Sequence, residues 1–482
     1  MGMRPALPIL GALLLLGPGG CTPADGATRY SSVLIEKVPH IRQRPDFCGE
    51  ACVAMALRRL GHKHDQDDVF AALGVDPLLG RGAVTREMVK GLKGLGFAVG
   101  AGWYHVRASR AARELDAQFK ALHADLKRGI PSILCMHYDA SPGTTEHFRL
   151  VLGYDAKTDE VIYNEPAEAN GAYRRMPRTK LLRLWPLKYR KDRWLAIRMR
   201  LEPRSVGPVR RVGTPPHTPA GYAQHIRKLR QTIRAKKLKG HFTVAIERPF
   251  VVLGDEAAGV VRRRARSTVR WSVERLKQAY FPRDPRRIIT IWLFRNRRSY
   301  LENTVKLTGR RPGTPFGFYS AELDAMIMNI DTGGGTLVHE IVHPFVEANF
   351  PGAPAWLNEG LGSLYEACGE QEGKIVGYTN WRLPHLQEAI RRGTVPSFRW
   401  LTSRTSDQFY QQDPGTNYGQ SRYLMYYLQE KGLLGTFYRR FHAARAKDPT
   451  GFKTLQQVLG AKGMDLFKAE WERFVLGLKW QG

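Results

Sequence analysis

The segment at residues 338–360 constrains the fold and function of this chain more than any other. It reads V-H-E-I-V-H-P-F-V-E-A-N-F-P-G-A-P-A-W-L-N-E-G. His339 and His343 are four residues apart, so on a helix they share one face and can bind a single metal ion. Glu340 lies beside them, where a carboxylate can take a proton from metal-bound water. The spacing predicts a catalytic metal site, and the alternative is a helix that carries two surface histidines.

A third metal ligand follows in the same segment. Catalytic zinc is usually held by three protein ligands and keeps a fourth position open. Glu359 can be the third ligand, because the prolines and glycine at 351–354 end the first helix and let a second one return. The sequence therefore predicts zinc as the cofactor, bound by His339, His343 and Glu359.

The pattern H-E-x-x-H…W-L-x-E-G resembles that of the gluzincin metallopeptidases, and more narrowly the peptidase MA-like group. The resemblance implies a zinc peptidase with Glu340 as the base that activates the zinc-bound water. The run N-Y-G-Q-S-R-Y-L that begins at Asn417 resembles the family helix that presents a tyrosine to the cleft. By that likeness Tyr418 donates to the oxyanion. Its helix is rich in tyrosine, so Tyr418 is equally well explained as a core aromatic.

One position departs from the pattern of the gluzincins. Four residues after the glutamate ligand, these enzymes usually carry a carboxylate that orients a ligand histidine, and this chain has Ser363. Such outer partners tune metal affinity. Glu366, about two turns beyond Glu359, is the candidate substitute. Metzincins are excluded, because their third histidine would fall at Asn349.

A second group of reactive residues begins at Gln43, in the run Q-R-P-D-F-C-G-E-A-C-V-A-M. Cys48 starts an apolar helix there, and a helix N-terminus favours the thiolate. Gln43 can offer an amide N–H to an oxyanion. A cysteine nucleophile also needs an imidazole and a group that orients it. His147, at the start of a predicted strand, is the candidate base, and Asn164 or Glu165, after the next strand, is the candidate orienting residue.

The order Gln, Cys, His, Asx/Glx is that of papain-like enzymes, and the local spelling resembles the C39 peptidase family over about residues 35–200. The resemblance implies a papain-like fold and a thiol peptidase. The family has Asp before Pro at the third position, where this chain has Glu165 preceded by Asn164, and either could hold the imidazole. The alternative is a buried structural Cys48 and a histidine at a strand end.

The first 21 residues are predicted to be a targeting segment. Arg4 supplies a positive start, the leucine-rich stretch at 10–16 is too short to span a bilayer, and Gly19-Gly20 precede Cys21. This pattern resembles a bacterial lipoprotein signal, with Cys21 as the acylated first residue. Pro18 departs from it, so ordinary signal cleavage stays open. Either way we expect an exported protein, lipid-anchored to the cell envelope in the first case and, in a Gram-negative cell, at the outer membrane.

The cysteine content and the net charge limit which stabilising bonds and which partners the chain can have. Besides Cys21 there are four cysteines, too few for a disulfide scaffold. The formal net charge is +31, from 75 Lys and Arg against 44 Asp and Glu. Nucleic acid is the least favoured partner, since an exported protein rarely meets it and no recognition motif is present. Anionic envelope polymers fit the expected location better, and a solvated basic surface is an equal alternative.

These observations predict an α+β chain with a signal segment (1–21), a C39-like cysteine peptidase domain (30–202), a Pro-rich basic linker with a helix (203–240) and a gluzincin-like metallopeptidase domain (241–482). The last is expected to have a small sheet followed by mostly helical sequence. The predicted function is an exported zinc peptidase whose partners are a peptide or protein substrate and, through the lipid anchor, the membrane. One alternative is a single metalloprotease whose C39-like domain only binds peptide. The other is a non-catalytic envelope-binding lipoprotein.

Overall fold

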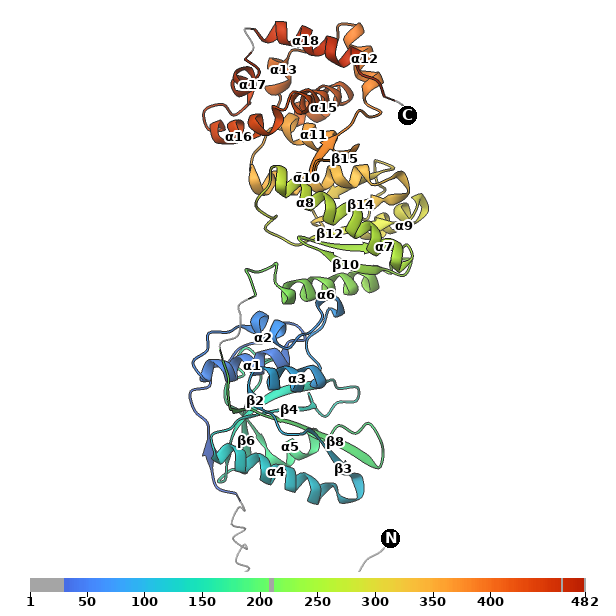
Figure 1. Ribbon diagram of the computed structural model, residues 1–482. Helices are drawn as coiled ribbons and strands as arrows, with labels where there is room; N and C mark the ends of the chain where they lie inside the picture. The colour runs from blue at the N-terminus through green and yellow to red at the C-terminus, as the bar shows by residue number, and fades with distance from the viewer. Residues whose placement is uncertain (1–29, 208–211, 461–462, 481–482) are drawn as a thin grey trace, which may run out of the picture.

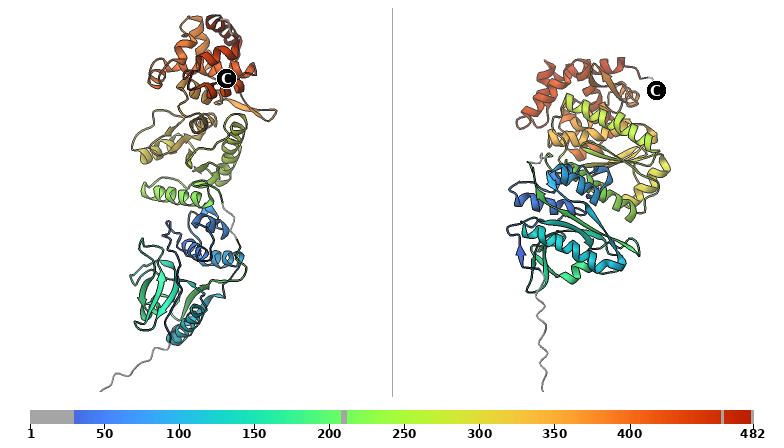
Figure 2. Two further views of the ribbon diagram at one scale, coloured as in Figure 1. Left: turned by 90° about the vertical axis from the view of Figure 1, so that its left-hand side faces the viewer. Right: turned by 60° about the horizontal axis from the view of Figure 1, so that its bottom comes forward.

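The computed structural model describes residues 30–207, 212–460 and 463–480, so the proposed signal segment and Cys21 lie outside the described residues. The molecule is elongated, with a β-rich N-terminal domain at one end and a helical part at the other (Figure 1, Figure 2). The mixed α+β class predicted from the sequence is confirmed. Within the described ranges, no helix is both long enough and apolar enough to cross a membrane.

The N-terminal domain is built on an antiparallel sheet with the strand order β3-β8-β4-β5-β6-β7, and β1 pairs with β5. Helices α1 to α3 lie between this sheet and the second domain (Figure 1). The elements are β1 (Val33–Leu34), α1 (Cys48–Arg59), α2 (Gln66–Ala72), α3 (Thr85–Gly94), β2 (Phe97–Ala98), β3 (Gly102–Arg107), α4 (Ala111–Lys127), β4 (Ser132–His137), β5 (Glu146–Asp155), β6 (Glu160–Asn164), β7 (Arg174–Pro177), α5 (Arg178–Leu184), β8 (Arg193–Arg200) and β9 (Glu202–Pro203).

Helix α1 is the centre of this domain. Nearly all of its residues are buried, and it packs against β5, the longest strand of the sheet. A helix buried in this way has little room for polar residues, which explains the run of small and apolar residues at 51–57; the buried Glu50 before it accepts a hydrogen bond from the Ala83 N–H. Its position places the first turn of α1 beside the strand that carries His147.

The basic helix α6 (Pro219–Ala235) packs on the sheet of the second domain. It begins where the Thr218 side chain accepts a hydrogen bond from the Gly221 N–H, as expected for a helix N-cap. Tyr222 and Ile226 are fully buried and pack with the strands of that sheet. The charged residues of α6 thus lie on a helix that the apolar core holds in place.

The other side of α6 contacts the first domain. Gln224 Nε2 donates to the Pro45 carbonyl at 2.9 Å, and Arg227 Nη1 lies 3.0 Å from Asp46 Oδ2. Both contacts are made to the loop that leads directly into Cys48. The helix therefore joins the two domains next to the candidate nucleophile.

The second domain opens with a five-stranded sheet of order β10-β11-β12-β14-β13. Its central pairs are parallel, its outer pairs are antiparallel, and β13 is an edge strand. The elements are β10 (Thr243–Glu247), β11 (Phe250–Gly254), α7 (Ala258–Arg264), a π-helical turn (Ala265–Arg270), α8 (Trp271–Ala279), β12 (Ile289–Phe294), α9 (Arg297–Thr308), β13 (Gly317–Ser320), β14 (Ala325–Asn329) and α10 (Gly335–Asn349). The helical segment from α7 to α8 is thus interrupted by a wider turn, in which Ala265 and Val269 are buried.

The rest of the chain is helical apart from one hairpin. Its elements are α11 (Ala355–Leu364), β15 (Cys368–Gln371), β16 (Lys374–Gly377), α12 (Leu383–Arg391), α13 (Phe398–Thr402), α14 (Ser406–Gln411), α15 (Pro414–Glu430), α16 (Leu434–Ala444), α17 (Phe452–Leu459) and α18 (Met464–Gly477). Trp356 anchors α11 in this part. Its ring packs on Phe437 and Phe441, and its Nε1 donates to the Thr450 carbonyl at 3.0 Å.

We expect Trp356→Ala to lower the free energy of unfolding by about 3–5 kcal/mol, because it leaves a large cavity and removes the hydrogen bond to the Thr450 carbonyl. Urea denaturation followed by circular dichroism measures the change. Trp381→Ala is the matched control, since Trp381 is 56% exposed and its loss should cost under about 0.5 kcal/mol. Equal effects of the two variants would contradict the anchoring role.

Candidate metal centre and thiol site

Helices α10 and α11 bring the three predicted metal ligands together. His339 and His343 project from one face of α10, and Glu359 reaches them from α11 after the chain turns back at 351–354. One ligand atom from each residue lies within 4.8 Å of the others. His339 Nε2 is 3.1 Å from Glu359 Oε2, and His343 Nε2 is 3.9 Å from Glu359 Oε1. The side chains of the three residues, two from α10 and one from α11, therefore converge on one point.

Each histidine is oriented by a partner on its other ring nitrogen. His339 Nδ1 is 3.1 Å from Glu366 Oε1, and His343 Nδ1 is 3.0 Å from Asn358 Oδ1. Both partners offer an acceptor oxygen, so a neutral ring would carry its proton on Nδ1 and direct its Nε2 lone pair to the point of convergence. This is the tautomer that a metal ligand needs.

Glu366 stands in for the carboxylate that the gluzincin pattern has where this chain has Ser363. The serine is buried, and its hydroxyl has no hydrogen bond among the described residues. Glu366 comes from just beyond the end of α11 and is itself paired with Arg382, whose Nη2 lies 2.7 Å from Glu366 Oε1. A displaced but equivalent carboxylate thus orients His339.

Two carboxylates beside one imidazole set the electrostatics of the site. Burial disfavours the imidazolium of His339, but the hydrogen bonds to Glu359 and Glu366 outweigh it and raise its pKa to about 10. Burial also opposes the charge of Glu359, yet the two histidines lower its pKa to about 2. Burial raises the pKa of Glu340 above that of an ordinary glutamate. The site is therefore strongly attractive to positive charge.

The spacing of these atoms fits zinc. Zinc–ligand bonds of about 2.0–2.2 Å at tetrahedral angles place the ligand atoms about 3.3–3.6 Å apart. The distances from Glu359 to His339 and to His343, 3.1 and 3.9 Å, lie just below and just above this range. Two imidazoles and one carboxylate are also a donor set that zinc accepts. His339, His343 and Glu359 would hold the ion.

A cleft of about 590 Å³ opens on the Glu340 side of the centre. Glu340 and Tyr418 both line it, and Phe316 and Trp381 form apolar parts of its wall. Burial and the nearby Glu359 carboxylate raise the pKa of Tyr418, so its hydroxyl stays protonated. Tyr418 lines the cleft and also packs against the core, so its position agrees with both interpretations given by the sequence.

Sequence reasoning missed three residues of this centre. Tyr410 donates its hydroxyl to Glu359 Oε1 at 2.7 Å, Asn358 accepts from His343, and Arg382 pairs with Glu366. Asn358 is adjacent to the ligand Glu359, a signal that could have found it. Tyr410 and Arg382 come from distant parts of the chain, and nothing in their local sequence marks them.

Two glycines of α11 allow the close packing. A Cβ on Gly362 would lie 3.2 Å from the His339 ring, and one on Gly360 would lie 3.1 Å from α15 at Met425 and Ser421. Both distances are tighter than ordinary packing. The sequence E-G-L-G thus lets α11 lie between the histidine and the helix that carries Tyr418.

The thiol site lies between α1 and β5. Cys48 begins α1, and one turn further along the helix Cys52 Sγ lies 3.7 Å from the carbonyl of Phe148, the residue after His147. His147 Nε2 is 2.5 Å from Glu165 Oε1. The other ring nitrogen of His147, Nδ1, takes no part in this contact. The structure therefore brings the candidate nucleophile, base and orienting carboxylate into one neighbourhood.

Asn164 and Glu165 point to different partners. Asn164 Oδ1 accepts from the Tyr173 N–H at 2.8 Å, and its amide contacts Met55 Sδ of α1 at 3.3 Å. Of the two residues that the sequence left open, Glu165 is the one that contacts His147. Gln43 lies on the loop before α1, with its backbone N–H donating to the Pro166 carbonyl at 2.8 Å.

A buried arginine changes the electrostatics of the thiol site. Arg149 Nε lies 2.6 Å from Glu165 Oε2, on the opposite side of the carboxylate from His147. The Arg149 side chain is held by the carbonyls of His137 and Tyr138 at 3.2 and 2.8 Å. Arg149 therefore pairs with the oxygen of the Glu165 carboxylate that His147 does not contact.

Burial raises the pKa of the Cys48 thiol to about 11. The expectation that the helix N-terminus favours the thiolate is thus corrected, because desolvation of the anion exceeds the effect of the backbone dipoles. At neutral pH the group is a thiol.

We expect iodoacetamide to alkylate Cys48 about 100-fold more slowly at pH 8 than an exposed cysteine of a model peptide, because two pKa units lower the thiolate fraction 100-fold. The rate should rise with pH up to about 11. Peptide mass spectrometry of the modified chain measures it. Rapid alkylation at pH 6–7 that is lost in His147→Ala would contradict this, since it requires a thiolate–imidazolium pair.

Comparisons with known proteins concern this N-terminal domain. Residues 35–193 match the model of the "Peptidase_C39 like family". The solved peptidase domain of Streptococcus ComA, a bi-functional ABC transporter involved in a quorum sensing pathway, is similar over 35% of this chain and 100% of its own length. The identity is 15% and the TM-score is 0.23. The search of curated proteins found no match. Residues 35–193 are accordingly similar to the C39-like peptidases.

Proposed function

We propose that the chain is a zinc-dependent peptidase of the cell envelope, with a gluzincin-like metallopeptidase domain following the C39-like peptidase domain. The observation that carries the proposal is the convergence of His339, His343 and Glu359 within 4.8 Å beside Glu340 and an open cleft. A set of two oriented imidazoles, a ligand carboxylate and a free carboxylate is what metal-assisted hydrolysis of a peptide requires.

The residues of the centre have distinct tasks. Zinc, when bound, acts as a Lewis acid that polarises the substrate carbonyl and makes water a better nucleophile. Glu340 accepts a proton from the attacking water and passes it to the leaving amine as the C–N bond breaks. Tyr418 donates its hydroxyl to the oxyanion that forms on the carbonyl oxygen. Glu366 and Asn358 hold the histidines in the required tautomer throughout.

A thiol peptidase at Cys48 is the second candidate activity. It is supported by the family match over residues 35–193 and by the contact between His147 and Glu165. In that reaction His147 takes the thiol proton while Cys48 attacks the peptide carbonyl. The raised pKa of Cys48 and the pairing of Glu165 with Arg149 support the other possibility, a domain that binds peptide for the metal centre.

The cellular location is part of the proposal. Residues 1–21 carry the lipoprotein-like signal, and acylation of Cys21 would anchor the protein to the envelope, where peptides are its substrates. The net charge of +31 suits contact with anionic envelope polymers. The presence of all three ligands and Glu340 argues against the alternative of a non-catalytic binding protein.

We expect the purified chain to contain close to one equivalent of zinc by elemental analysis, and His343→Ala to contain little. His105→Ala is the matched control, because His105 is exposed on β3 of the other domain. Glu340→Gln should keep the zinc and lose about 10²–10⁴-fold of any peptide hydrolysis. A well-folded parent without zinc after incubation with the ion would reject the proposal.

We further expect Glu366→Gln to weaken zinc binding about 10–100-fold, because it removes the charge that orients and polarises His339. Competition with a chromophoric chelator measures the affinity. Ser363→Ala tests the position that the family pattern favours and should leave zinc affinity unchanged. Unchanged zinc affinity in Glu366→Gln together with weaker binding in Ser363→Ala would show that Glu366 has no part in the centre.

A further inference from the structure

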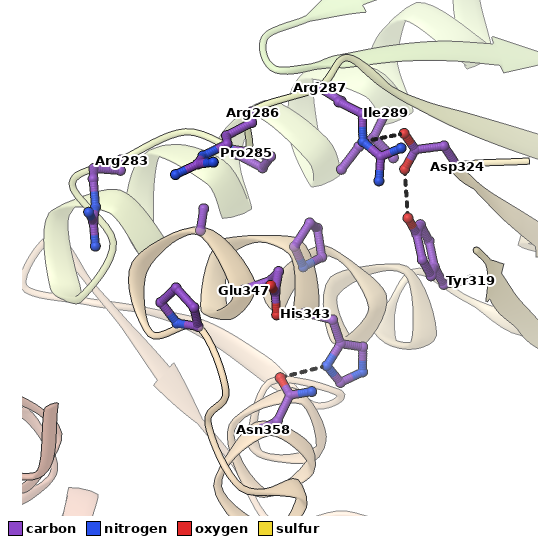
Figure 3. A pocket seen from close by; sticks show the side chains of 13 residues that line it. Arg283, Pro285, Arg286, Arg287, Ile289, Tyr319, Asp324, His343, Glu347 and Asn358 are labelled. Atoms are coloured by element: carbon purple, nitrogen blue, oxygen red, sulfur yellow. Dashed lines mark hydrogen bonds and ion pairs between the residues drawn. The ribbon is translucent and has the colours of Figure 1, made fainter. Parts of the chain in front are cut away.

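A second hollow, of about 560 Å³, lies on the opposite side of the metal centre from the Glu340 cleft. Its wall is the segment between α8 and β12, and its floor is the exposed side of α10. We call it the arginine pocket, and its defining residues are Arg283, Arg286, Arg287, His343, Glu347 and Asn358. Figure 3 shows the three arginines along one wall, across from His343 and Asn358.

The three arginines differ in how far their charge is compensated. Arg287 is paired with Asp324 at 3.0 Å. Arg283 Nη2 donates to the Asn349 carbonyl at 3.1 Å, which leaves its charge without a carboxylate. Arg286 is exposed and forms no ion pair with any residue in the described part of the chain.

The pocket has a surplus of one positive charge. Asp324 compensates Arg287, and Glu347, the other acidic residue of the lining, can offset only one of the two remaining guanidinium groups. Guanidinium groups bind carboxylates through two parallel hydrogen bonds, and they are less strongly hydrated than ammonium groups. A single carboxylate is therefore the ligand that this lining matches.

The position of the pocket connects it to the proposed reaction. His343 lines the pocket and is also a ligand of the candidate metal centre. A peptide whose reacting carbonyl lies at that centre extends into the arginine pocket on one side and into the cleft with Phe316 and Trp381 on the other. In the Glu340 cleft the lining arginine, Arg382, is already paired with Glu366. Only the His343 side thus offers uncompensated positive charge to a substrate.

We propose that the arginine pocket is a carboxylate-binding subsite, with Arg286 and Arg283 as its specificity-determining residues. This rests on the proposed peptidase function. The carboxylate is either an acidic side chain next to the scissile bond or the free α-carboxylate at the end of a peptide. The first makes the enzyme an endopeptidase that favours acidic residues, and the second makes it an exopeptidase.

The test measures binding to the full-length Glu340→Gln chain loaded with zinc, so that it does not depend on turnover. The probes are fluorescein-labelled, amidated peptides Ala-Ala-Phe-Xaa-Ala-Ala and Ala-Ala-Xaa-Phe-Ala-Ala, with Glu or Gln as Xaa. A shorter peptide, Ala-Ala-Phe-Gln, carries a free α-carboxylate, and its amide is the reference. Fluorescence anisotropy gives the dissociation constants.

We expect about tenfold tighter binding when one of the carboxylates is present, as a charge-assisted bidentate contact provides. Arg286→Gln and Arg283→Gln should each reduce this preference, and Arg298→Gln should keep it, since Arg298 is 84% exposed on α9, outside the pocket. An advantage for the Glu peptides identifies the side-chain carboxylate, and one for the short acid identifies the α-carboxylate. Equal binding of all pairs, or a preference that survives in both pocket variants, overturns the subsite.

Hydrolysis by the unmodified chain separates the two proposals. Cleavage of the peptides without any preference for a carboxylate would leave the peptidase function in place and reject the subsite. A preference in binding that depends on Arg286, without cleavage of any peptide, would keep the subsite and reject the peptidase function.

Discussion

The burial of two carboxylates beside His339 is the interaction on which the rest of the second domain depends. Carboxylates are excluded from a protein interior unless positive charge compensates them. Arg382 compensates Glu366, and His339 with His343 compensates Glu359. In the absence of a metal ion, the charge needed at Glu359 comes from a proton on His339, whose pKa is about 10. A metal ion held at the ring nitrogen would take the place of this proton beside Glu359.

The two candidate sites use carboxylates in opposite ways. At the metal centre Glu359 faces imidazoles and remains available as a ligand. At the thiol site Glu165 lies between His147 and Arg149, at 2.5 and 2.6 Å, and is already neutralised. A neutralised carboxylate can still fix the orientation of an imidazole, as an amide would.

The sequence predicted those site residues that lie close together on a single helix or strand. The spacing of His339 and His343 follows from the helical repeat, and the helices and central strands follow from their apolar patterns. Consecutive residues at a strand end point to opposite sides, so one of Asn164 and Glu165 had to face His147, but the choice depends on packing against Tyr173 and Met55. Partners such as Tyr410 and Arg382 could not be predicted, because long-range packing of α14 and the start of α12 brings them to the centre.

The position of α6 also limits how the high positive charge can be explained. Two of its polar side chains, Gln224 and Arg227, bind the loop before Cys48, and its apolar face packs on the second sheet. These contacts make part of the basic segment an interdomain connection rather than a free binding surface. The same loop carries Gln43 and leads into Cys48, so these contacts of α6 lie next to the thiol site. Part of the basic charge of the chain thus lies on a helix that connects the two domains.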